Sequence, residues 1–90
     1  MNEIINDSHG FILKDRKNLV LTGVREVIGF DEKAVEIITV LGGLSIRGEN
    51  IKIQSFNTES GDMEITGRFA AMMYVNDSAK RDSFFAKLFR

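Results

Sequence analysis

The sequence contains no cysteine, and histidine occurs once, at position 9. Without thiols the chain can form no disulfide, no thiolate metal site and no cysteine nucleophile. A catalytic triad or a histidine metal site needs an imidazole held by partner side chains. His9 lies in a polar N-terminal segment, residues 1–9, which is expected to be flexible and to expose the ring to solvent.

Acidic and glycine-rich stretches give no stronger chemical signal. Asp31-Glu32 and the cluster at 57–62 fall in predicted turns, and the spacing in 57–64 does not match a calcium loop. The stretch LGGLSIRG (41–48) lacks the lysine of a phosphate-binding loop and precedes a strand. The sequence therefore predicts no enzyme, no metal, no cofactor and no small-molecule substrate.

Long apolar runs are also absent. No stretch approaches the roughly 20 apolar residues that span a bilayer, and MNEIINDSHG lacks the basic and apolar parts of a secretory signal. We expect a cytoplasmic protein that is at most peripheral to a membrane.

What the chain does contain is a succession of short, β-branched, alternating segments separated by turn residues. Segments at 10–16, 18–30, 34–40, 44–48, 49–56 and 63–75 read as strands, with a bend at Gly23. This pattern predicts an all-β, single-domain sandwich or roll of about six short antiparallel strands over residues 10–76.

The last predicted strand changes character part-way. Residues 63–69 alternate cleanly, but from Ala70 onward both faces are apolar. Such a strand end is either buried on both sides or covered by another subunit. A possible subunit contact, and with it a homo-oligomer, is therefore predicted at Ala70, Met72, Met73 and Tyr74.

Residues 77–90 form a separate basic and aromatic tail. Asp77 or Ser78 can cap a helix, which would gather four large apolar side chains on one stripe, with basic side chains beside them. This segment either folds back over the sheet or docks to a membrane surface or partner. Its predicted interaction residues are Phe84, Phe85, Lys87, Leu88, Phe89 and Arg90.

The strength of such an anchor can be bounded. Burying four large apolar side chains gives on the order of 6–12 kcal/mol, and ordering ten residues costs roughly 1–2 kcal/mol each. Since the two nearly cancel, one tail alone is a weak anchor, which favours a protein partner or several tails on an oligomer.

Charge is unevenly distributed along the chain. Residues 1–78 carry eight Lys/Arg against twelve Asp/Glu, and residues 79–90 carry four against one. A mildly acidic body is a poor nucleic-acid surface, so no nucleic-acid partner is expected. A small β-barrel that binds nucleic acid through the basic tail is the alternative from another functional class.

Several spaced blocks resemble the YabP/YqfC family of endospore-forming bacteria. They are LTGVREV (21–27), FDE (30–32), LGGLSIRGENIKI (41–53) and ESGDMEITG (59–67), and the terminal FFAKLFR (84–90) is similar to the YabP branch. Gly29 and Phe56 depart from the family pattern.

The resemblance implies a β-sandwich-like, non-enzymatic protein of the mother cell during spore formation, with no catalytic residues to carry over. It also implies a membrane partner, YabQ-like, at a membrane surrounding the forespore.

Overall fold

The structure, a computed structural model, describes residues 8–75. They form six strands: β1 (Gly10–Lys14), β2 (Asn18–Thr22), β3 (Val24–Asp31), β4 (Ala34–Thr39), β5 (Gly42–Asn57) and β6 (Asp62–Val75). All neighbours pair antiparallel in one sheet of order β1-β2-β6-β5-β4-β3. The predicted all-β fold is confirmed, and the predicted helix over 77–90 lies outside the described residues.

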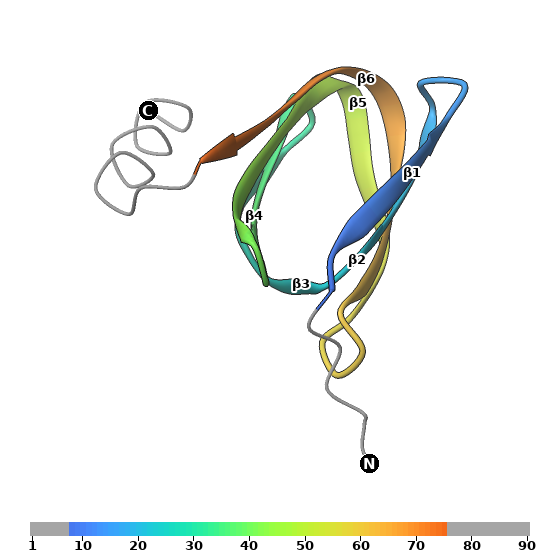
Figure 1. The fold of residues 1–90 in the computed structure, drawn as a ribbon. Coiled ribbons are helices and arrows are strands. Elements are labelled where there is room, and N and C mark those ends of the chain that lie inside the picture. Colours follow the sequence, from blue (N-terminus) through green and yellow to red (C-terminus); the bar gives the residue numbers. More distant parts are fainter. Residues whose placement is uncertain (1–7, 76–90) are drawn as a thin grey trace.

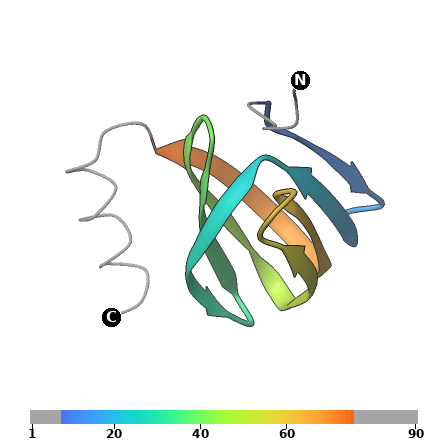
Figure 2. The ribbon, with the colours of Figure 1, turned by 90° about the horizontal axis from the view of Figure 1, so that it is seen from below.

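The sheet bends so that its two halves face each other (Figure 1). In one half, β3 pairs with β4, β4 pairs with the first part of β5, and this part of β5 pairs with the end of β6. In the other half, β1 pairs with β2, β2 pairs with the first part of β6, and this part of β6 pairs with the end of β5. These halves are called here the β3–β4 layer and the β1–β2 layer. A view from below shows the two layers crossing one another (Figure 2).

The bend is made within β5 and β6 themselves. We expected two short strands at 44–48 and 49–56, but they form one strand of 16 residues, β5. Its pairing with β6 shifts register between Arg47 and Gly48 and again between Glu49 and Lys52. A Cβ on Gly48 would collide with the carbonyl oxygen of Arg68, so only glycine permits this close approach of the two backbones.

The chain passes from one layer to the other at Gly23, where the sequence predicted a bend. This residue has a φ of +72°, a conformation that favours glycine. Two backbone bonds hold the crossing in place: Val40 N–H donates to the Gly23 carbonyl (2.9 Å), and Val24 N–H donates to the Gly61 carbonyl (3.0 Å).

The core lies between the two layers and draws on every strand except β1. Its side chains alternate with outward ones along each strand, as a half-buried sheet requires. Eleven buried side chains form it: Leu19, Leu21, Val24, Val35, Ile37, Leu44, Ile46, Ile51, Met63, Ile65 and Phe69.

Candidate functional site: a basic corner and the end of β6

Five cationic side chains gather where the sheet bends, and we call this group the basic corner. They come from four separate parts of the chain and are all exposed: Arg16, Lys17, Lys33, Arg47 and Arg68. Residues 8–75 contain eight Lys/Arg and nine Asp/Glu. The described body is thus close to neutral, while most of its cations lie on one corner.

The β1–β2 turn brings two of these cations to the bend. Asp15 and Arg16 adopt left-handed φ angles of 56° and 57°, and Lys17 N–H donates to the Lys14 carbonyl (3.0 Å). This is the tight hairpin geometry that matches sheet twist. The turn is then fastened to β6, because the Arg16 carbonyl accepts from Phe69 N–H (2.9 Å) and Arg16 Nε donates to the Phe69 carbonyl (3.0 Å).

The β3–β4 turn is fastened to the same bend from the other side. The Lys33 carbonyl accepts from Gly48 N–H (2.9 Å), and the Glu32 carbonyl accepts from Ile51 N–H (2.8 Å). Two turns distant in sequence are therefore held by backbone bonds against one corner. Their cations are positioned by the fold rather than by pairing with acids.

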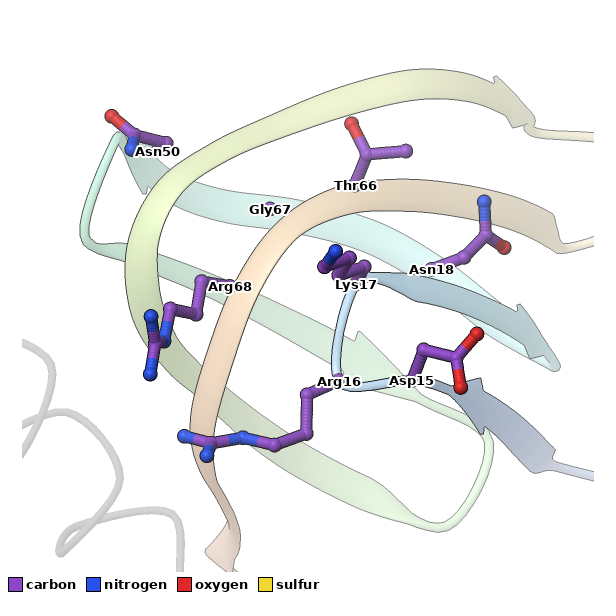
Figure 3. A pocket seen from close by; sticks show the side chains of 8 residues that line it. All are labelled: Asp15, Arg16, Lys17, Asn18, Asn50, Thr66, Gly67 and Arg68. Carbon is purple, nitrogen blue, oxygen red and sulfur yellow. The ribbon is translucent and has the colours of Figure 1, made fainter.

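Two open depressions, of about 760 and 560 Å³, adjoin at this corner, and Arg16 and Arg68 line both. The Arg16 side chain extends from the β1–β2 turn toward β6, which carries Arg68, while the Asp15 carboxylate points away from both guanidinium groups (Figure 3). No cation of the corner forms an ion pair with another residue of 8–75. Guanidinium groups that gather at one place without an acidic partner are suited to bind a phosphate or carboxylate ligand.

Sequence reasoning missed the basic corner. It averaged charge along the chain and found the body mildly acidic. The corner depends on contacts between segments up to 53 residues apart, such as Arg16 with Phe69. The only local sign was DRK (15–17), which begins within the predicted strand 10–16 and ends one residue after it.

We expected the His9 ring to be exposed to solvent. Instead it is half-buried, and both ring nitrogens form hydrogen bonds. Nδ1 lies 2.7 Å from the Thr22 carbonyl oxygen, and Nε2 lies 2.6 Å from the Tyr74 hydroxyl oxygen. The carbonyl can only accept, so Nδ1 carries a proton. Both nitrogens are thus engaged in tying chain segments together.

Within residues 8–75 no group of three or more His, Asp or Glu is arranged to hold a metal ion. Nor does this part of the chain contain a helix long and apolar enough to cross a membrane.

Glu36 of β4 is an unusual buried acid. It is fully buried, and neither carboxylate oxygen has a hydrogen-bond partner; the Oγ of its cross-strand neighbour Ser45 also has none. Burial raises the pKa of Glu36 to about 7, against the lowering effects of the nearby Ser45 hydroxyl and the charge of Arg47. A buried carboxyl with a raised pKa is either neutral near physiological pH or ionised when a cation binds to it.

The end of β6 is more exposed than a strand buried on both sides. Met73 is 46 % exposed and Tyr74 43 %, whereas Met72 packs against the core. Ala70 is exposed. The strand end is thus not buried on both sides within the described residues. Its other predicted explanation, contact with another subunit, stays a prediction. The predicted tail residues from Phe84 to Arg90 lie outside the described residues.

Comparison with known proteins gives the family. The model of the YabP family matches residues 5–81. The chain belongs to the YabP family. A curated relative, Spore protein YabP of Bacillus subtilis (strain 168), is 34 % identical over 88 residues, which cover 96 % of this chain and 88 % of the relative. The resemblance found in the sequence is thereby confirmed, and the chain is a sporulation-related protein.

Proposed function

We propose that this YabP-family protein is a non-enzymatic assembly protein of the mother cell. It docks, through residues 77–90, to a YabQ-like membrane protein at a membrane surrounding the forespore. The observation that carries the proposal is the exposed apolar end of β6, which precedes a basic and aromatic tail. β6 ends with Met73 and Tyr74 both more than 40 % exposed, and the four large apolar side chains of the tail come after the polar stretch 76–83. Exposed apolar surface of this kind marks interaction sites.

The basic corner supports a position at a membrane surface. Lipid phosphate groups are anions that guanidinium and ammonium groups bind, and each basic side chain near an anionic leaflet contributes about 1 kcal/mol. Five cations at one corner thus supply an attraction that the overall charge of the body does not suggest. The corner orients the body, and the tail supplies contact with the protein partner.

Self-association strengthens attachment in this proposal. Because one tail is a weak anchor, several tails on one assembly bind far more firmly than one. The end of β6, with Ala70, Met72, Met73 and Tyr74, is the proposed contact between copies.

Co-sedimentation tests the proposal. The full chain and a truncation ending at Asn76 are mixed with bare vesicles and with membranes that carry the YabQ-like protein. We expect the full chain to pellet strongly with the partner membranes and the truncation to lose most of that binding. Matched variants Phe85→Ala and Ala86→Gly, both in the tail, separate loss of an apolar contact from a general change in the segment.

Two outcomes oppose the proposal. Equal pelleting of full chain and truncation with partner membranes places the partner surface on the β-body. Failure of either to pellet with partner membranes removes the docking role altogether.

A further inference from the structure

The β3–β4 layer has an outward face with an unusual composition. Side chains alternate along its strands, so the residues between the core positions point outward. On β4, Val35 and Ile37 are core residues, which places Glu36 outward. The register then puts Ser45 and Met73 beside it on the same face. The outward residues are Ala34, Glu36 and Ile38 from β4, Gly43, Ser45 and Arg47 from β5, and Ala71, Met73 and Val75 from β6.

The centre of this outer face is as buried as the inside of a protein, while Met73 of the same face is 46 % exposed. Ala34, Glu36 and Ser45 are 5 % exposed or less. The β1–β2 layer lies on the core side, so none of the six strands covers the face (Figure 1). At its centre, the Glu36 carboxylate has no hydrogen-bond partner among the described residues. A buried carboxylate without a partner is costly and calls for a cation or donor.

We propose that residues 77–90 of the same chain dock on the outer face of the β3–β4 layer and cover Glu36. The occupant is thus an amphipathic basic segment. Its binding site is the outer face of the β3–β4 layer, which we call the seat.

Position and length favour this segment. Val75, the last residue of β6, itself belongs to the outer face and pairs with Gly43. Glu36 is only two strands away, since it pairs with Ser45, which pairs with Met73. The fifteen residues that follow Val75 can therefore reach the centre of the face without crossing the core.

Charge and apolarity favour it as well. Residues 77–90 contain four Lys/Arg against two Asp, so the segment is cationic, and the face holds a buried carboxyl that forms no hydrogen bond with Arg47, the cation of the same face. A helical segment would present Phe84, Phe85, Leu88 and Phe89 as one stripe. That stripe matches the apolar side chains that share the outer face with Glu36, namely Ala34, Ile38, Met73 and Val75.

This inference stands without the membrane partner of the proposed function. If residues 77–90 bind both the sheet and the membrane partner, the partner must displace them from the sheet, so the two interactions compete. Docking of the segment on a second copy is a different outcome, which the experiment below separates.

The absence of cysteine makes a direct test possible. Ser83→Cys introduces a single thiol, opposite the apolar stripe on a helical segment, for a nitroxide spin label. Paramagnetic broadening of backbone amide signals is then measured in the full-length chain. We expect the strongest broadening at Ile38, Ser45 and Met73, and several-fold less at Ile12 and Val20, which belong to the β1–β2 layer. Absent broadening, or equal broadening of both layers, would overturn the proposal.

A mixed sample separates docking within one chain from docking between chains. Isotope-labelled protein without the nitroxide is combined with unlabelled protein that carries it. Broadening of the labelled protein comparable to that in the single-chain sample assigns the contact to a second copy and overturns docking within the chain.

Charge on the face provides an independent check. Met73→Lys places a cation beside the seat and is expected to reduce the broadening at Ile38 several-fold. Ile12→Lys makes the same change at a 72 % exposed position on the other layer and is expected to leave it unchanged. Equal effects of the two variants count against the proposed seat.

Discussion

The imidazole of His9 bridges the two ends of the described chain: its Nε2 accepts from the Tyr74 hydroxyl across 2.6 Å, a contact between residues 65 apart in sequence. The two rings also meet edge to face, with centroids 5.7 Å apart and an interplanar angle of 78°. The other ring nitrogen donates to the Thr22 carbonyl at the end of β2. One side chain thus ties the entry to β1 to the end of β6 and to β2.

The first prediction concerns this bridge. Tyr74→Phe keeps the ring contact but leaves Nε2 of His9 without its donor, and the expected loss in free energy of unfolding is about 1 kcal/mol. His9→Ala removes both bonds and is expected to cost about 2 kcal/mol. Urea denaturation of the two single variants and the double variant measures the coupling. Strictly additive losses would show that the two side chains do not interact.

The second prediction concerns Glu36 and pH. Burial raises its pKa from 4.5 to about 7 in the folded chain. Between these values the folded chain holds a proton that the unfolded chain has released, so stability falls as pH rises through this range. The full effect is about 3 kcal/mol at most, since one unit of pKa corresponds to about 1.4 kcal/mol.

Glu36→Gln isolates that contribution, because the amide does not titrate. We expect the free energy of unfolding of the natural chain to fall from pH 5.5 to 7, while that of the variant falls less over the same interval. Parallel pH profiles would mean that Glu36 has an ordinary pKa in the folded chain.

Much of the strand layout could be predicted because its signals are local. Glycine at position 23 and the acidic turn residues at 31–32 and 57–62 interrupt alternating apolar segments, and the structure has its bend and turns there. The long β5 could not be predicted in this way, since Gly48 reads as the end of a strand and separated the predicted strands 44–48 and 49–56. Asn50 has a left-handed φ of 54°, which the chain adopts inside a continuous bent strand.

The candidate sites depend on contacts that no local pattern reveals. Alternation in AVEIITV predicts that Glu36 points away from the core, but its burial depends on what lies above the sheet. The basic corner requires backbone bonds from Arg16 and Lys33 to the bends of β6 and β5. Register between distant strands determines both features, and the sequence contains no direct record of register.

The third prediction tests the bend of the sheet. Gly48→Ala would force a Cβ into the Arg68 carbonyl, and its three nearest atoms are all backbone. Backbone atoms have no rotamer to change, so we expect a loss of about 3 kcal/mol or more in thermal or urea unfolding. Gly10→Ala is the matched control, because its Cβ would meet only the Thr22 Oγ1 at 3.9 Å. Equal stability of the two variants would contradict the role given to Gly48.

The last prediction concerns the basic corner. Arg68 lines both depressions, and Arg68→Glu replaces its positive charge by a negative one. Each basic side chain near an anionic surface contributes about 1 kcal/mol. We therefore expect this change of two charges to lower affinity for anionic phospholipid vesicles by about thirtyfold at low salt. Arg25→Glu makes the same change at an exposed residue outside the corner and is expected to have a much smaller effect. Binding is measured by vesicle sedimentation over a range of salt concentrations, because contacts with lipid phosphates weaken as salt screens them. Similar losses for both variants would indicate attraction by net charge alone, and binding unaffected by salt would exclude the corner as an electrostatic site.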